Sequence, residues 1–243
     1  MQTETTSTVD GIRERVEQLD WDDLETQLDA TGYAITTRLL DPDECHALAD
    51  LFDHGRFRST IDMARYRFGD GRYRYFEHPL PDEIAALRAS FYPHLVPIAN
   101  RWGGQLRGER PTFPLAHDDL LERCHRAGQN RPTPLILRYG AGDWNALHQD
   151  LYGEVYFPFQ VLTVLSDPDD YAGGEFVLLE QRPRAQSRAH VLRPAQGVFV
   201  IFPTRERPNA GKYGYHRVAL RHGVSTVTAG ERIALGVIFH DGR

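Results

Sequence analysis

The C-terminal half of the sequence is divided into apolar segments that are too short for typical helices. From Pro134 onward, six segments of five to nine residues are rich in aliphatic, aromatic and β-branched residues, and Gly, Pro, Asp or Asn bounds each one. Such segments are typical of β-strands. They cover residues 135–139, 159–165, 175–179, 197–202, 213–220 and 232–240. Six strands of this length predict a β-sandwich or barrel.

The N-terminal half has the pattern of helices with a single strand. Residues 21–30, 45–52, 82–102 and 118–126 predict helices, and residues 32–37 predict a strand. A helix start is expected at Asp41, whose side chain can cap, with Pro42 in the first turn and Glu44 completing a capping box. The fold class we expect is mostly β (α+β), with a β core braced by N-terminal helices.

The sequence contains no internal repeat and no long linker, so we expect a single domain over residues 1–243. Within it, we expect a partly flexible N-terminus over residues 1–20. Residues 21–130 are expected to form a helical brace and lid region, and residues 131–243 the β core that carries the chemistry.

Composition excludes several classes of protein. The longest apolar runs, 198–202 and 233–239, fall far short of the roughly 20 residues that a membrane-spanning helix needs. The first ten residues lack the layout of a signal peptide. Two cysteines, Cys45 and Cys124, are too few for a disulfide framework. We therefore expect a cytoplasmic protein without a membrane partner. The net charge of −6 argues against a protein that coats nucleic acid by bulk attraction.

A candidate metal site begins with His148 and Asp150, which are separated by one residue. In extended chain, residues i and i+2 point to the same side, so both can bind one ion. With a remote histidine they would give two imidazoles and one carboxylate, a set that suits non-haem Fe(II). The alternative is a buried, hydrogen-bonded His–Asp pair. A second such pair, His117 and Asp119, opens an apparent helix, where capping explains the acidic residue better.

Four features in order resemble the Fe(II)/2-oxoglutarate-dependent dioxygenases, whose fold is a double-stranded β-helix, or jelly roll. Residues 32–45 look like the family's strand-then-helix entry, and residues 139–150 like its tyrosine strand, glycine turn and ligand pair. Gly173-Gly174-Glu175, with the apolar segment 197–203 after it, looks like a further strand pair. The stretch from His222 to Arg232 looks like the distal histidine followed, ten positions later, by the 2-oxoglutarate arginine.

The resemblance implies a role for each of these residues. His148, Asp150 and His222 would bind Fe(II), and Arg232 would form a two-pronged salt bridge to the far carboxylate of 2-oxoglutarate. The implied reaction uses O₂, converts 2-oxoglutarate to succinate and CO₂, and hydroxylates a substrate C–H bond. Tyr139 would donate a hydrogen bond to the co-substrate.

Two points of the motif stay open. His216 is a rival third ligand, because it lies six positions before His222 and has the same strand parity, although the spacing to the arginine favours His222. Many relatives carry a serine two positions after the arginine, where this chain has Ala234. The co-substrate would then take its remaining hydrogen bonds from elsewhere, for example from Tyr139 or Tyr152.

Residues 66–76 offer a candidate substrate surface. Read as a hairpin that turns at Gly69–Gly71, they place arginines, including Arg67 and Arg74, on one face and aromatic residues on the other. Interleaved arginines and aromatics can hold phosphates and stack bases. The alternative is an ordinary hairpin with its aromatic face in the core.

Three functions remain open at this stage. Residues 138–150 look most like AlkB-type nucleic-acid demethylases, and the whole chain resembles a bacterial branch of oxygenases acting on damaged nucleic acid. Leu137 and Ile238 depart from the AlkB pattern, and the C-terminal half resembles prolyl-hydroxylase-type enzymes. The candidates are oxidative demethylation of alkylated nucleobases, hydroxylation of a small molecule, amino acid or protein side chain, and a jelly-roll binding module without catalysis.

Overall fold

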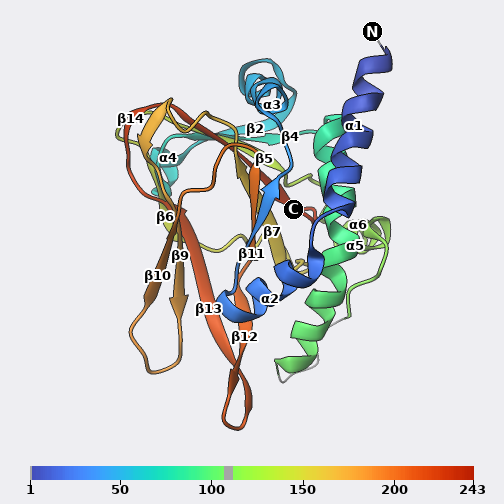
Figure 1. Ribbon diagram of the computed structural model, residues 1–243, viewed down its shortest axis with the longest axis vertical. Coiled ribbons are helices and arrows are strands. Elements are labelled where there is room, and N and C mark those ends of the chain that lie inside the picture. The colour runs from blue at the N-terminus through green and yellow to red at the C-terminus, as the bar shows by residue number, and fades with distance from the viewer. Residues whose placement is uncertain (1, 107–111) are drawn as a thin grey trace.

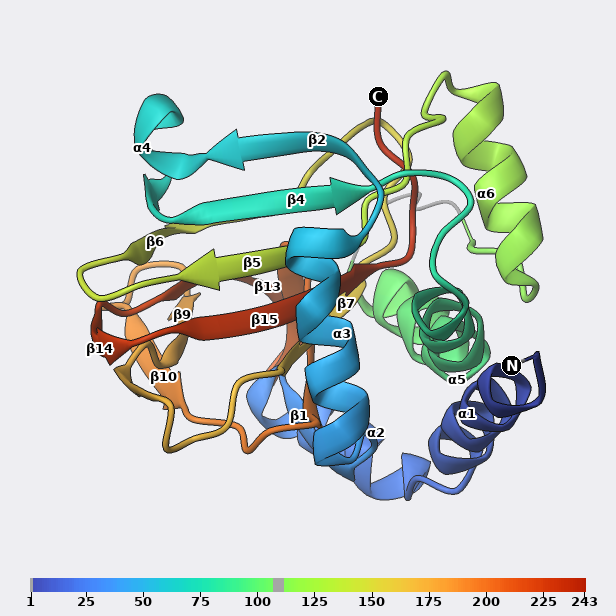
Figure 2. The same ribbon diagram turned by 90° about the horizontal axis from the view of Figure 1, so that it is seen from above.

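Two facing antiparallel sheets form the centre of the molecule (Figures 1 and 2). The fold is known from a computed structural model, which describes residues 2–106 and 112–243. The larger sheet has the strand order β1 (Ala34–Arg38), β11 (Val198–Pro203), β7 (Phe159–Val164), β15 (Arg232–Ile238), β5 (Leu135–Tyr139), β4 (Arg72–Phe76) and β2 (Phe57–Asp62).

The smaller sheet faces the larger one and carries two long hairpins. Its strand order is β10 (Arg188–Leu192), β9 (Phe176–Gln181), β13 (Gly214–Val224), β6 (Trp144–His148) and β3 (Gly69–Asp70), and β12 (Glu206–Gly211) pairs with β13. A two-stranded ribbon joins β8 (Tyr171–Gly173) to β14 (Val227–Gly230). This arrangement confirms the mostly β, jelly-roll fold expected from the sequence.

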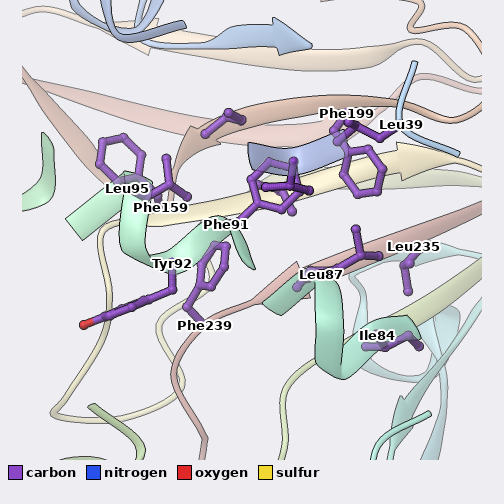
Figure 3. Close-up of a cluster of buried hydrophobic side chains, with 14 of the residues drawn as sticks. Leu39, Ile84, Leu87, Phe91, Tyr92, Leu95, Phe159, Phe199, Leu235 and Phe239 are labelled. Atoms are coloured by element: carbon purple, nitrogen blue, oxygen red, sulfur yellow. The ribbon is translucent and has the colours of Figure 1, made fainter. Parts of the chain in front are cut away.

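Most of the helices lie on the outer side of the larger sheet (Figure 2). The helices are α1 (Gln2–Glu17), α2 (Trp21–Thr31), α3 (Pro42–His54), α4 (Met63–Tyr66), α5 (Asp82–Gln105) and α6 (His117–Arg126). Helix α4 lies beyond the end of β2 (Figure 2). Helix α5 supplies Ile84, Leu87 and Phe91 to a core that also contains Phe199 and Leu235 of the sheet (Figure 3). Figure 1 shows α1 beside α5 on the side of the molecule opposite β10.

A second apolar cluster lies between the two sheets. The larger sheet contributes Leu137, Leu162 and Phe202 to it, and the smaller sheet contributes Phe176 and Leu178. Alternating residues of the central strands therefore face either the helices or the space between the sheets. Side chains on this inner face are the ones that can build an enclosed site.

Most predicted elements are present, and local chemistry explains their starts. The side chain of Asp41 accepts a hydrogen bond from the Glu44 backbone N–H, and the Glu44 side chain accepts one from the Asp41 N–H, which is the expected capping box. Helix α1 occupies the stretch where a partly flexible terminus was expected, and its Ile12 and Val16 are buried. No described helix is both long and apolar enough to cross a bilayer.

The hairpin predicted for residues 66–76 is wrong. Residues 63–66 form the one-turn helix α4, which starts where the Asp62 side chain accepts a hydrogen bond from the Ala64 N–H. Strand β4 pairs instead with β2 and β5, and the short β3 pairs with β6. The arginine and aromatic residues of this segment therefore lie in α4, in the turn after it and in β4, and do not form the two faces of a single hairpin.

Candidate active site

Three potential metal ligands meet where β6 lies against β13. His148 is the last residue of β6, and His222 lies directly opposite it on β13. The predicted strand ended at residue 220, but β13 continues to Val224 because it pairs with both β9 and β6, which places His222 within the sheet. Asp150 follows β6 after one residue, as the His-x-Asp spacing predicted.

The ligand atoms of these residues converge on one point. One ligand atom from each of His148, Asp150 and His222 lies within 4.8 Å of the others. The Nε2 atom of His148 is 3.4 Å from Asp150 Oδ1, and the Nε2 atom of His222 is 3.1 Å from Asp150 Oδ2. Two imidazoles and one carboxylate in this arrangement match the donor set that non-haem Fe(II) favours.

Backbone contacts hold His148 in the tautomer that a metal needs. Its Nδ1 atom donates a hydrogen bond to the Ala146 carbonyl oxygen at 2.7 Å, because a carbonyl can only accept. The lone pair of the neutral ring is then on Nε2, which faces Asp150. The ring of His222 is fixed differently, by packing against Phe202 with ring centroids 4.9 Å apart.

The electrostatics of the cluster favour a bound cation. Burial alone would raise the pKa of Asp150, but the charges and hydrogen bonds of His222 and His148 outweigh it and hold this pKa well below the usual 3.8. Burial and the neighbouring His148 lower the pKa of His222. Burial also acts to lower the pKa of His148, but Asp150 outweighs it and raises that pKa. An ionised carboxylate therefore lies between two imidazoles, and binding of a metal ion would displace any proton on their Nε2 atoms into solvent.

Tyr152 has a contact that the sequence did not indicate. Its hydroxyl donates a hydrogen bond of 2.5 Å to Oδ1 of Asp150. The sequence suggested Tyr152 as a substrate or co-substrate contact, whereas in the structure its hydroxyl lies on the candidate metal ligand. The hydroxyl of Tyr75 lies behind it in hydrogen-bond contact. Tyr152 therefore fixes one carboxylate oxygen of Asp150.

Arg232 is a buried cation without a bonded anion. It begins β15 opposite Tyr139, is 1% exposed, and has no anionic partner among the described residues, while the Tyr171 hydroxyl is the one polar side-chain group close enough to interact with it. Burial lowers its pKa, while Tyr139, Tyr171 and Glu175 act in the opposite direction. A buried guanidinium in this state is costly unless an anion binds it. The residues present therefore fit a dicarboxylate co-substrate.

The Gly-Gly-Glu segment makes room for this arginine. Gly174 has φ of +66°, and a Cβ atom there would lie 2.8 Å from Cδ of Arg232. The side chain of any other residue would thus collide with the arginine in a backbone conformation that only glycine adopts readily. The hydroxyl of Tyr139 is neutral, because burial raises its pKa to about 12, and it accepts a hydrogen bond of 3.2 Å from Asn145.

The metal ligands and Arg232 line one cavity of about 210 Å³ between the two sheets. Its other walls are mainly apolar, and Phe68 lies at its rim. Phe68 and its neighbour Tyr66 are 48% and 49% exposed, and their rings stack with centroids 5.7 Å apart. The Phe68 carbonyl accepts a hydrogen bond from the Ala146 N–H, which fixes the aromatic pair beside the metal ligands.

The remaining sequence candidates lie outside this cavity. His216 pairs with Asn209 in the β12–β13 hairpin, where its Nε2 atom is 3.3 Å from the Asn209 amide nitrogen. Arg74 packs over Phe52 and donates to its backbone carbonyl. Arg67 is exposed next to Phe68, in a left-handed conformation at the end of α4. Of the proposed substrate contacts, the structure therefore brings only Tyr152 to the cavity lining.

Comparison with known proteins decides the family. The model of a family described as an oxygenase catalysing oxidative methylation of damaged DNA matches residues 71–242. The chain belongs to this oxygenase family. Two uncharacterized proteins from strains of Mycobacterium tuberculosis are each 50% identical to it, over 71% of this chain and 78% of their own length.

Solved structures show the same fold at low sequence identity. A prolyl-4-hydroxylase from Pseudomonas putida has a TM-score of 0.54 at 15% identity, covering 92% of this chain and 99% of the enzyme. An oxidoreductase of the 2OG-Fe(II) oxygenase family from Burkholderia pseudomallei has a TM-score of 0.54 at 19% identity, covering 91% and 92%. A Trichoplax adhaerens prolyl hydroxylase in complex with a hypoxia inducible factor peptide reaches 0.57 at 16% identity, covering 89% and 86%.

Family, fold and ligand set together confirm the expected enzyme class. The chain is an oxygenase by family, its fold is that of solved 2OG-Fe(II) oxygenases, and His148, Asp150 and His222 form a cluster that could hold a metal ion. The expectation of a binding module without catalysis is set aside by this result.

Proposed function

We propose that this oxygenase binds Fe(II) through His148, Asp150 and His222, binds 2-oxoglutarate through Arg232, and oxidises an alkylated nucleobase. When bound, the iron with 2-oxoglutarate and O₂ supplies an oxidant strong enough to hydroxylate a C–H bond. One oxygen atom enters the substrate, and the other enters succinate as 2-oxoglutarate loses CO₂. For an N-methyl group, the hydroxylated carbon then leaves as formaldehyde and restores the base.

The protein's own contribution is to position these groups. Arg232 would anchor the far carboxylate of the co-substrate with two parallel hydrogen bonds, which is the interaction that a guanidinium without an anionic partner allows. The carboxylate of Asp150 is held by Tyr152, and the ring of His148 is held by the Ala146 carbonyl. Apolar walls exclude water from the place where the C–H bond is broken.

The exposed aromatic pair at the rim is the observation that favours a nucleobase. Phe68 lines the cavity, the ring of Tyr66 stacks on it, and both are half-exposed; every base has a flat face that stacks on such rings. Enzymes that modify a base act on single strands or turn the base out of the duplex into a pocket. A narrow apolar cavity behind aromatic rings fits one unpaired base. The family description points to the same class of substrate.

The test is turnover with defined substrates. Purified protein with Fe(II), 2-oxoglutarate and O₂ would be incubated with single-stranded oligonucleotides that carry N-methylated bases, and succinate and formaldehyde would be measured. We expect both products in equal amounts, their loss in His222→Ala, and their retention in His216→Ala. Succinate release that responds to peptides or free amino acids and not to any methylated oligonucleotide would contradict the proposal and support a hydroxylase of those substrates.

A further inference from the structure

Gln160 is the second residue of the cavity whose buried polar atom has no partner. Among the described residues that line the cavity, buried side-chain nitrogens without a hydrogen bond belong to Arg232 and Gln160. The Gln160 side chain is 4% exposed, and its Nε2 atom has no acceptor. Burying an amide donor without an acceptor is unfavourable, so such a group marks a place where a ligand supplies the acceptor. Arg232 already has a proposed partner, whereas Gln160 has none.

The surroundings of Gln160 give the amide no structural role. It lies in β7, which is buried along its whole length, between Phe202 of β11 and Ile238 of β15. The other residues of β7 that line the cavity, Val161 and Leu162, are apolar. An aliphatic residue at position 160 would suit this environment better than an amide does.

The strand register separates Gln160 from the co-substrate anchor. Gln160 lies opposite Ile238, six residues along β15 from Arg232, which is about 20 Å at the usual rise of a strand. A five-carbon diacid held by Arg232 and the metal ligands would end well before Gln160. Phe202, the neighbour of Gln160, packs on the ring of His222. Gln160 therefore lines the same cavity as the candidate metal ligands, on a strand next to Phe202, and lies away from Arg232.

We propose that Gln160 is a specificity-determining residue that donates its Nε2–H to an acceptor on the substrate base, such as a carbonyl oxygen or ring nitrogen. This assignment rests on the proposed function and adds to it. A stacked base can still rotate in its plane, and one directed hydrogen bond fixes that rotation and so selects which methyl group faces the metal. Sites that leave a buried polar group unpaired when the wrong substrate binds discriminate strongly.

The test measures oligonucleotide affinity, the unfolding temperature of the protein and 2-oxoglutarate affinity separately. Gln160→Leu removes the unpartnered amide, so we expect an unfolding temperature equal to or above that of the wild type. In the presence of Mn(II) and 2-oxoglutarate, which allow binding without turnover, we expect affinity for a single-stranded oligonucleotide with one N-methylated base to fall about tenfold. The affinity for 2-oxoglutarate should not change. Gln160→Glu, which keeps the shape but replaces the donor with a carboxylate, should weaken oligonucleotide binding at least as much.

Gln196 provides the matched control. It is 3% exposed, but its Nε2 atom donates to the Leu165 carbonyl at 2.8 Å, and it does not line the cavity. Gln196→Leu should lower the unfolding temperature and leave oligonucleotide affinity unchanged. The role of Gln160 would be overturned if the Gln160→Leu variant bound the oligonucleotide as tightly as the wild type does. It would also be overturned if the variant lost affinity for 2-oxoglutarate and kept its affinity for the oligonucleotide. Neither result would affect the proposed function. If the wild type binds methylated and unmethylated oligonucleotides equally, the proposed function fails and this assignment fails with it.

Discussion

Arg232 and Arg207 are both about 1% exposed, yet they differ in what surrounds the charge. Arg207 donates to the buried carboxylate of Glu180 at 2.8 Å, whereas Arg232 has no anionic partner in the described chain. Removing one member of a buried ion pair typically costs about 3–5 kcal/mol, because the other charge stays buried and unpaired. Replacing Arg232 leaves no buried anion behind, so this cost in unfolding free energy does not arise.

The two arginines should therefore respond oppositely to replacement. We expect Arg207→Leu to lower the free energy of unfolding by about 2 kcal/mol, the value of a charged hydrogen bond, because Glu180 keeps its contact with Arg182 at 2.6 Å. We expect Arg232→Leu to leave the free energy of unfolding unchanged or to raise it. In the wild type, 2-oxoglutarate with Mn(II) should raise the unfolding temperature, and Arg232→Leu should abolish that rise. Denaturant and thermal unfolding measure both effects. A large loss of stability in Arg232→Leu without ligand would show that the guanidinium is already paired.

Tyr152 acts on the metal site through Asp150, so it is a positioning residue. Tyr152→Phe keeps the ring but removes the hydrogen bond to Oδ1, and loss of such a partner typically weakens metal affinity by about 10–100-fold. Calorimetric titration with Mn(II) measures this effect without turnover. Tyr213→Phe, at a position 84% exposed on the β12–β13 hairpin, is the control and should bind Mn(II) like the wild type. Equal affinities in all three proteins would contradict a positioning role.

At the scale of residues, sequence reasoning succeeded where spacing along one strand carries the information. His148 and Asp150 are two residues apart, at and just after the end of β6, so their grouping can be read from the chain. In contrast, His222 of β13 and Arg232 of β15 were indicated by the family resemblance. The partners of Tyr152 and the isolation of Gln160 depend on strands that are distant in sequence. Those contacts are properties of the folded sheets, and no local pattern predicts them.

At the scale of elements, the segment 63–71 shows why local alternation can mislead. Arginines and aromatics alternate here as in a hairpin, but the Asp62 cap favours a helical turn, and β4 finds partners in β2 and β5. Alternation tells which residues share a face, and it does not tell which strand lies alongside. The segment instead ends in β3, an edge strand that pairs with β6. This pairing holds the preceding residue, Phe68, at the cavity.

The aromatic rim should contribute to substrate binding and not to stability. Phe68→Ala removes a half-exposed ring, so we expect a change in unfolding free energy within about 0.5 kcal/mol. Stacking of one base on an aromatic ring is worth about 1–3 kcal/mol, so the affinity for a single-stranded oligonucleotide should fall about tenfold. Fluorescence anisotropy measures this change, and Tyr213→Ala is the exposed aromatic control. Unchanged affinity in Phe68→Ala would remove the rim from the binding site.

At the scale of the whole molecule, Asp241 ties the C-terminus to the helical layer. Its carboxylate accepts hydrogen bonds from Arg88 of α5 at 2.7 Å and from His125 of α6 at 3.0 Å, and it is fully buried. Burial alone would raise the pKa of Asp241, but the charge and hydrogen bond of Arg88, with that of His125, lower it. Helices from the first half of the chain are thereby held against the end of β15.

The lowered pKa makes this contact sensitive to acid. Because the folded-state pKa lies below the unfolded value near 3.8, the stabilisation is present at neutral pH and is lost as the pH falls through the folded-state value. We expect Asp241→Asn to lower the free energy of unfolding at pH 7 by about 3 kcal/mol, since Arg88 is left buried without its anion. The difference from the wild type should shrink towards pH 3. A difference that stays constant from pH 7 to pH 3 would contradict this role.

Much of the architecture was accessible from the sequence because the apolar strand patterns are concentrated after Pro134 and the helix patterns before it, although β2 to β4 in the first half were not recognised as strands of the two facing sheets. The lateral order of the strands was not accessible, since β1 from the start of the chain lies beside β11 near its end. In the smaller sheet, a separate long-range pairing of β13 with β6 places His222 opposite His148 and so brings the metal cluster together. The candidate site depends on contacts between segments that are distant in sequence. The sequence motifs identify the residues of the site but not the strand pairings that bring those residues together.

The most direct test is anaerobic titration of the protein with Fe(II) and 2-oxoglutarate, followed by visible absorption. A keto acid chelated to Fe(II) gives a charge-transfer band. We predict this band for the wild type and for His216→Ala, and its absence in His222→Ala and Asp150→Ala. In Arg232→Leu it should require much higher 2-oxoglutarate concentrations. A band of full intensity in His222→Ala, or none in the wild type, would contradict the assignment of this site.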